Sequence, residues 1–126
     1  MTQYPSLSEK VIFKKERLLT PVTKSSLLSN TSPLTHLTID SKSRIEDLPN
    51  CAYIDFANKR IGGGSLNSPA VQEEILFAIF PEACVSMGLF DQMDDTQAIS
   101  LENLIRSAQY TGYGSSFSYK SPFYTY

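Results

Sequence analysis

Three consecutive glycines, Gly62 to Gly64, constrain this chain of 126 residues more than any other feature. Glycine adopts positive φ angles that other residues resist, and it lets backbone approach a ligand closely. The run Cys51–Ala57 before the glycines has the length and apolar character of a central strand covered on both faces. Ser68 and Pro69 after them are typical of a helix N-cap and first turn, which predicts a helix ending near Phe80. This order predicts a ligand site at the carboxyl end of the strand.

The rest of the chain predicts an α/β domain. Three further runs have the alternation or composition of strands: Leu34–Asp40, Thr96–Leu101 and Ser116–Lys120. Val11–Phe13 fits either a short strand or a helix start, and Pro81 opens a second short helix. Ser25–Pro33 is rich in loop-forming residues and predicts a connection. Strands alternating with helices are typical of α/β folds.

Charge is distributed unevenly along the chain. Nine of the eleven Lys and Arg residues precede Ile61, whereas seven acidic and no basic residues lie between Ile61 and Ile105. A net charge of −2 argues against a dedicated nucleic-acid-binding protein. Without cationic partners nearby in the sequence, these acids either cover a solvated surface or mark a site. Both interpretations remain open at this stage.

Other residues that could carry chemistry give only weak signals of a functional site. His36 is the only histidine, which excludes a multi-histidine metal site. Asp91, Asp94 and Asp95 lack the glycine and downstream glutamate of a calcium loop, so they predict a solvated acidic loop. Cys51 and Cys84 are too few for a disulfide framework and fit a core role. We therefore predict no metal site and no cofactor.

The start of the predicted helix carries paired carboxylates. Glu74 projects between the positions of Phe77 and Ala78, so its surroundings should be partly apolar. Desolvation raises the pKa of a carboxyl group, as a general acid near neutral pH requires. The alternative is that Glu73 and Glu74 stabilise the helix dipole from its N-terminal end.

One extended motif in the sequence resembles the signature of a known family. The segment Asp55–Gly64 (DFANKRIGGG), followed after seven residues by Gln72–Ile75 (QEEI), resembles the signature of the poly(ADP-ribose) glycohydrolase family. Three other segments resemble that family in the same order: Ile45–Asp47, Phe80–Glu82 and Gln109–Tyr113. The resemblance extends from about Val11 to Tyr119.

The resemblance implies a macrodomain-like mixed sheet with flanking helices. Residues 1–10 would form an N-terminal tail, and residues 11–126 would form part of the catalytic domain. The catalytic domains of the family continue beyond the Tyr-Thr-Gly-Tyr segment into a glycine-rich loop that binds the diphosphate. We therefore expect a fold truncated at its C-terminal end and slow or absent hydrolysis by this chain alone.

The implied activity is hydrolysis of ribose–ribose O-glycosidic bonds in poly(ADP-ribose), which releases ADP-ribose. By the resemblance, Glu74 is the catalytic acid/base, with Glu73 holding ribose hydroxyls and Asp55 beside them. The implied substrate-binding residues are Ile45 and Glu46 at adenine, Phe56 and Asn58 at the terminal ribose, the loop glycines Gly62, Gly63 and Gly64, Gln72, and Tyr113. An ordinary half-buried aromatic residue is the alternative for Tyr113.

Adjacent helix residues point about 100° apart, so Glu73 and Glu74 should not flank one bond as an opposed pair. One carboxyl group would then perform both proton transfers, and the absence of Lys or Arg nearby in the sequence suits that role. The alternatives are an ADP-ribose-binding module, an inactive pseudoenzyme, or a remnant that does not fold alone.

Partners and location also follow from the resemblance. The expected partners are poly(ADP-ribose), ADP-ribose and ADP-ribosylated proteins, with no direct binding to nucleic acid or membranes. The sequence contains no secretory signal or apolar run long enough to span a bilayer, and its two cysteines suit a reducing compartment. We expect an intracellular protein of the nucleus or cytoplasm, and the resemblance connects it with the DNA damage response.

Overall fold

The computed structural model describes residues 10–67 and 71–124, and the chain divides into two compact units. The first unit contains Met1–Arg17 and Asp55–Tyr126, and the second contains Leu18–Ile54. The glycine motif and the paired glutamates therefore belong to the first unit. Ile45 and Glu46 belong to the second.

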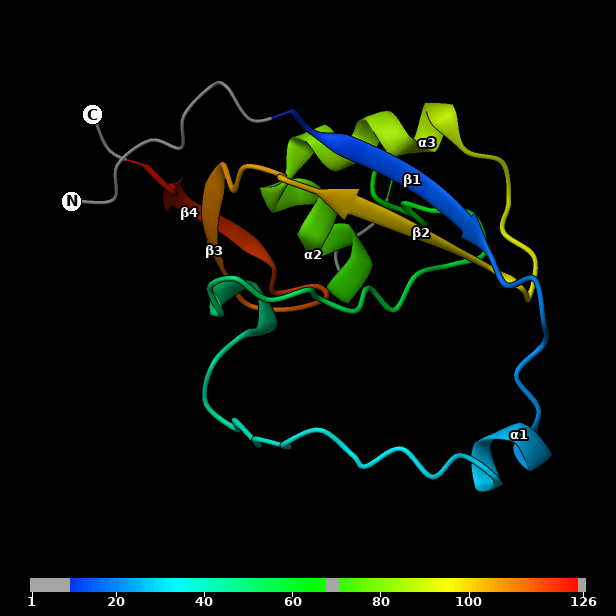
Figure 1. The fold of residues 1–126 in the computed structure, drawn as a ribbon. Helices are drawn as coiled ribbons and strands as arrows, with labels where there is room; N and C mark the ends of the chain where they lie inside the picture. Colours follow the sequence, from blue (N-terminus) through cyan, green and yellow to red (C-terminus); the bar gives the residue numbers. More distant parts are fainter. Residues whose placement is uncertain (1–9, 68–70, 125–126) are drawn as a thin grey trace. The chain divides into compact units, whose positions relative to one another are not determined.

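Two antiparallel strand pairs lie in the first unit (Figure 1). Strand β1 (Ile12–Arg17) pairs with β2 (Gln97–Glu102) over its whole length. Strand β3 (Ala108–Thr111) pairs with β4 (Ser118–Pro122), with an irregularity in register after Gln109. The β1–β2 pairing joins segments 80 to 90 residues apart in the sequence, and the second unit lies between them along the chain.

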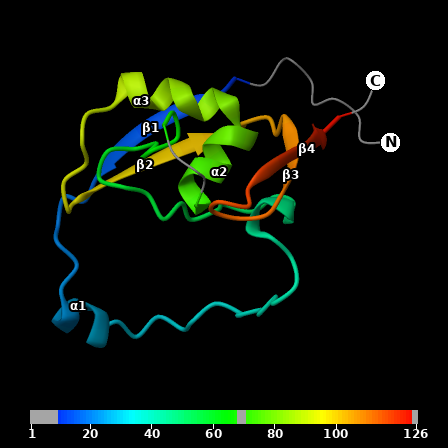
Figure 2. The same cartoon turned by 180° about the vertical axis from the view of Figure 1, so that it is seen from behind.

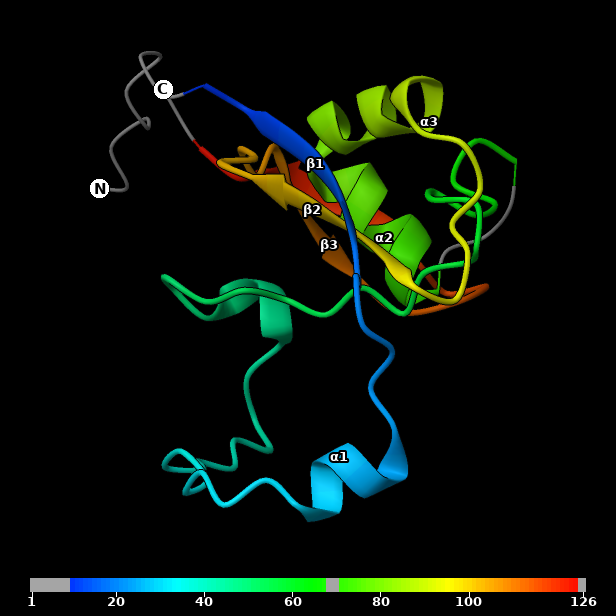
Figure 3. The same cartoon turned by 45° about the vertical axis from the view of Figure 1, so that its right-hand side comes forward.

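The buried core gathers on the helices of the first unit. Helix α2 (Gln72–Ile79) is followed by the 3-10 helix η2 (Pro81–Val85) and by α3 (Ser86–Leu89), and these helices lie on one side of the β1–β2 pair (Figures 2 and 3). Ile75, Phe77 and Ile79 of α2 are buried. The carbonyl oxygen of Ile79 accepts a hydrogen bond from the backbone N–H of Ser107 at 2.8 Å. The C-terminal end of α2 is thereby fixed to the segment that leads into β3.

The second unit contains a short helix, α1 (Lys24–Leu28), and a 3-10 helix, η1 (Ile45–Asp47). Thr23 caps α1, because its hydroxyl oxygen accepts from the backbone N–H of Ser26 at 3.1 Å. The predicted connection Ser25–Pro33 thus contains helical residues. None of the helices in the described ranges of the chain is long and apolar enough to cross a membrane.

Several predicted elements are confirmed. The α/β composition, the helix through Ile79, the second helix after Pro81, and the strands near Thr96–Leu101 and Ser116–Lys120 are all present. Val11–Phe13 contributes to a strand rather than to a helix. Strand β3 was not predicted by the sequence patterns. The predicted cap at Ser68 and Pro69 lies outside the described residues.

The predictions of two strands and of one core residue are wrong. Leu34–Asp40 is not a strand, and its apolar side chains are exposed, Leu34 to 98%. A β-branched composition forms a strand only where a neighbouring strand or a core covers it. Cys51–Ala57 is not a strand either, and the N–H of Phe56, which a strand would use for pairing, is hydrogen-bonded to the side chain of Gln72 in α2. Cys51, which we expected in the core, is exposed.

Three of the seven acidic residues between Ile61 and Ile105 have cationic partners. Ion pairs join Lys14 to Glu102, Arg17 to Asp94 and Lys59 to Asp95. For these three residues the expectation of acids without partners is wrong. The pairing of β1 with β2 brings Lys14 and Arg17 beside Glu102 and Asp94, and Lys59 reaches Asp95 from the loop before α2. Exposed pairs of this kind contribute roughly 0–1 kcal/mol each to stability.

Candidate functional site

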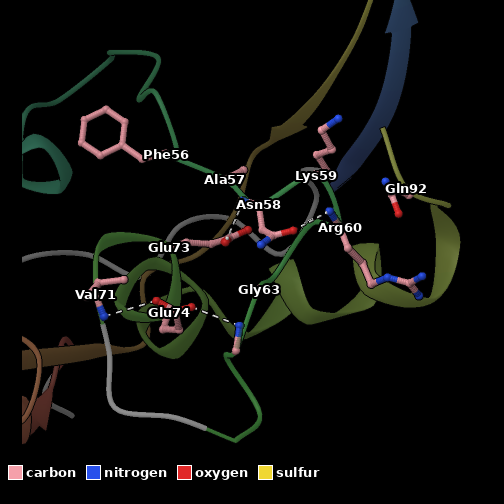
Figure 4. A pocket seen from close by; sticks show the side chains of 11 residues that line it. Phe56, Ala57, Asn58, Lys59, Arg60, Gly63, Val71, Glu73, Glu74 and Gln92 are labelled. Carbon is pink, nitrogen blue, oxygen red and sulfur yellow. Dashed lines mark hydrogen bonds between the residues drawn. The ribbon is translucent and has the colours of Figure 1, made fainter. Parts of the chain in front are cut away.

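A pocket of about 790 Å³ lies where the glycine motif meets the start of α2 (Figure 4). It is lined by both predicted glutamates, by most of the loop before them and by one residue of a distant loop: Phe56, Ala57, Asn58, Lys59, Arg60, Gly63, Gly64, Val71, Glu73, Glu74 and Gln92. The sequence motif and the pocket therefore coincide.

The loop before α2 is held by side chains of the first turn of that helix. The side-chain oxygen of Gln72 accepts from the backbone N–H of Phe56 at 2.8 Å. The two carboxylate oxygens of Glu73 accept from the N–H groups of Gly62 at 2.7 Å and Asn58 at 3.1 Å. Glu73 is only 4% exposed, and charge-assisted hydrogen bonds compensate the burial of its charge.

Glu74 is held in a similar way at the edge of the pocket. One carboxylate oxygen accepts from the N–H of Gly64 at 3.0 Å, and the other accepts from the N–H of Val71 at 3.2 Å (Figure 4). Val71 is the N-cap position of α2, so Glu74 also satisfies one of the free N–H groups at the helix end. Unlike Glu73, Glu74 is half-buried. Its carboxylate is both fixed and accessible.

The glycines bring the two carboxylates together. Gly62 and Gly63 have φ angles of +91° and +47°, in the region that favours glycine. A Cβ atom at Gly63 would lie 2.5 Å from an oxygen of Glu73 and 2.9 Å from an oxygen of Glu74. Although the two side chains leave the helix in different directions, both carboxylates converge on Gly63.

The N–H groups of the three glycines all have partners within the protein. Gly62 and Gly64 donate to Glu73 and Glu74, and Gly63 donates to the carbonyl oxygen of Arg60 at 3.2 Å. In this structure, the N–H groups of this loop are therefore occupied by groups of the protein itself. The loop binds the protein's own carboxylates and fixes their positions.

Asp55 adds a third carboxyl group to the site. One of its carboxylate oxygens is buried and has no hydrogen-bond partner among the described residues. Burial, together with the charges of Glu73 and Glu74, raises the pKa of Asp55 from 3.8 to about 6. No group of His, Cys, Asp or Glu side chains among the described residues is arranged to hold a metal ion.

The raised pKa of Asp55 predicts a pH-dependent stability. An unfolded chain loses this proton near pH 3.8, whereas the folded chain retains it to about pH 6. The contribution to stability is therefore complete below pH 3.8 and is lost as the pH rises through 6. Because Asp55 is half-buried, solvent screening reduces the effect, and Asp55→Asn should stabilise the chain at pH 7.5 by about 1 kcal/mol, or about 4 °C in Tm.

Thermal melts of the wild-type chain and of Asp55→Asn check this expectation across pH 4 to 8. The difference in Tm should shrink as the pH falls to 4, because Asp55 of the folded chain is then neutral like Asn. A difference that stays constant over this range would contradict the assigned ionisation. Asp40→Asn is a matched control, because Asp40 is exposed and its pKa is lowered by hydrogen bonds from Lys42 and Ser43.

The remaining predicted residues lie in different places. Gln72 supports the loop from α2, and Gly62 is a buried residue of that loop. Tyr113 lies between β3 and β4, is 58% exposed, and does not line the pocket. Ile45 and Glu46 lie in η1 of the second unit.

Sequence reasoning missed three polar residues of the pocket. Lys59 and Arg60 belong to the recognised motif but had no assigned role, and they contradict the expectation that no cation lies near the glutamates. Gln92 gave no signal in the sequence. It reaches the pocket because the N–H of Met93 donates to the carbonyl oxygen of Lys59 at 2.8 Å.

Comparisons with known proteins assign the family. The family model described as "Poly (ADP-ribose) glycohydrolase (PARG), Macro domain fold" matches residues 24–125. Poly(ADP-ribose) glycohydrolase 1 of Arabidopsis thaliana is 48% identical over 82 residues, which are 64% of this chain and 15% of that protein. Poly(ADP-ribose) glycohydrolase 2 of Caenorhabditis elegans is 41% identical over 92 residues, which are 73% and 19% of the two chains.

Poly(ADP-ribose) glycohydrolase 1 of Caenorhabditis elegans is 47% identical over 70 residues, which are 56% of this chain and 9% of that protein. The chain thus spans less than a fifth of the length of each of these three relatives. The family model nevertheless covers well over half of the chain, from α1 of the second unit through β4 of the first. This protein therefore belongs to the poly(ADP-ribose) glycohydrolase family and has the macro domain fold of that family.

Proposed function

We propose that this chain binds poly(ADP-ribose) and hydrolyses its ribose–ribose O-glycosidic bonds, with Glu74 as the catalytic acid/base. The observation that carries the proposal is the position of Glu74, which lines the pocket with a carboxylate held by the N–H groups of Gly64 and Val71. The family membership supports the substrate class. Poly(ADP-ribose), ADP-ribose and ADP-ribosylated proteins are the proposed partners.

Glu73 would hold the reacting ribose. Each oxygen of a carboxylate can accept two hydrogen bonds, and each oxygen of Glu73 accepts one from the backbone. One acceptor position on each oxygen is therefore not used by the backbone, and Glu73 lines the pocket, so we propose that ribose hydroxyl groups donate to it from the pocket side. Phe56 and Asn58 line the same pocket, which supports their proposed place beside the terminal ribose.

Glu74 would perform both proton transfers. In its protonated form it donates to the leaving 2′-oxygen while an oxocarbenium-like centre develops on the ribose carbon. The resulting carboxylate then takes a proton from the attacking water, which restores the acid. Asp55 belongs to the same group of carboxyl groups, because its ionisation responds to the charges of Glu73 and Glu74. We propose that it helps to position the reacting groups.

A release assay tests this proposal directly. The chain is incubated with poly(ADP-ribose), and ADP-ribose is measured against a protein-free control, while calorimetry measures the binding of ADP-ribose. We expect binding together with slow release above the control. Binding without release would instead favour an ADP-ribose-binding module, and the absence of both would contradict the proposed substrate.

A further inference from the structure

The pocket that holds Glu74 continues into a second hollow. The second hollow is lined by Arg17, Met93 and Asp94, among others, and the two share Lys59 and Gln92. The hydrogen bond from Met93 to Lys59 keeps the two loops together at this junction. The surface is therefore hollowed beyond the space that one ribose next to Glu74 would occupy.

Two cations, Lys59 at the junction and Arg60 next to it in the sequence, are available to a ligand. The guanidinium of Arg60 is exposed and has no polar partner among residues 10–67 and 71–124, while its backbone N–H donates to the side-chain oxygen of Asn58. Lys59 pairs with Asp95 at 3.4 Å, and both side chains are largely exposed, by 66% and 92%. An exposed pair at this distance contributes little and is easily exchanged for another anion.

The charges of the pocket are separated along its length. Figure 4 shows Lys59, Arg60 and Gln92 at one end and Glu74 with Val71 at the other. The carboxylates repel a phosphate group but accept hydrogen bonds from ribose hydroxyls. The guanidinium of Arg60 binds phosphate oxygens with two parallel hydrogen bonds. A ligand with neutral riboses next to a diphosphate fits this separation with a ribose at the carboxylates and a diphosphate at Lys59 and Arg60.

We propose that Arg60, assisted by Lys59, binds the diphosphate of the ADP-ribose unit next to the one whose ribose lies at Glu74. This subsite rests on the proposed function, because it assumes the same polymer as substrate. With this subsite, the protein would bind the polymer more tightly than the monomer. A single ADP-ribose unit held at Glu74 would not occupy the subsite.

The test compares binding of ADP-ribose with binding of its dimer, joined by the ribose–ribose bond. Both ligands are measured in a Glu74→Gln background, which keeps the dimer intact. Adding Arg60→Ala should weaken dimer binding about 10-fold and leave monomer binding within 2-fold. The affinity for the dimer should also become less dependent on salt concentration, because one charge–charge contact is lost. Arg60→Lys should retain part of the affinity.

Lys120→Ala is the matched control, because it removes an exposed positive charge on β4 outside both hollows. A loss in Arg60→Ala no greater than in Lys120→Ala would overturn the subsite, as would an equal loss for monomer and dimer. Either result leaves the proposed hydrolysis intact. Failure of the parent chain to bind either ligand would overturn both proposals.

Discussion

Replacing Glu74 by Gln is expected to slow the release of ADP-ribose by about 10²–10⁴-fold, or about 3–5 kcal/mol in activation free energy. The amide has almost the same shape but transfers no proton to the leaving oxygen. One amide oxygen can still accept from Gly64 or Val71, so the helix end keeps part of its support. Binding of ADP-ribose should change by less than 10-fold. Rates from the release assay and affinities from calorimetry check both expectations.

Glu16→Gln is the control for this substitution, since Glu16 is an exposed carboxylate on β1 outside the pocket. It should keep the wild-type rate. A thermal melt of each variant separates a chemical effect from a loss of folded protein. A Glu74→Gln variant that is folded and retains most of its rate would show that another group transfers the proton.

Replacing Gly63 by Ala is expected to slow release by about 10²-fold or more. The added Cβ atom would lie 2.5 Å from Glu73 and 2.9 Å from Glu74, so at least one carboxylate must move. Glu73 has little freedom to move, because it is buried and bonded to two backbone N–H groups. A displacement of about 1 Å in a catalytic group is enough for an effect of this size.

Gly114→Ala is a closely matched control for the backbone. Gly114 has a φ of +57°, close to the +47° of Gly63, but an added Cβ there would meet nothing within 4 Å. Both variants therefore carry the same strain of about 1–2 kcal/mol from a left-handed alanine. Only Gly63→Ala should lose activity, measured at a temperature where both are folded. Equal activities would show that the carboxylates tolerate displacement.

The centre of the site was predictable because its pattern is contiguous in the sequence. Glycines followed by Gln72, Glu73 and Glu74 predicted a loop against a helix N-terminus, and the structure places both glutamates in a pocket beside that loop. The helix itself was predictable from its apolar residues and from Pro81, which ends it. Such local signals depend on propensity and spacing within a few turns of chain.

The acceptors of the loop's hydrogen bonds were not predictable in the same way. A glycine run is compatible with binding a ligand anion or a protein carboxylate, and the choice depends on which group approaches it. Glu73 reaches Gly62 across 11 residues, and Gln72 reaches Phe56 across 16. These bonds also take the N–H of Phe56 that the predicted strand would have used.

The sequence by itself determined the family motif, the helix that carries Glu73 and Glu74, and the chemistry available to them. The tertiary structure alone decided that Lys59, Arg60 and Gln92 share their pocket, and that burial raises the pKa of Asp55. It also decided that β1 pairs with β2 and neutralises acids that lacked local partners. The physical reason is that burial and charge pairing depend on segments far apart in the chain, whose approach no local pattern of residues encodes.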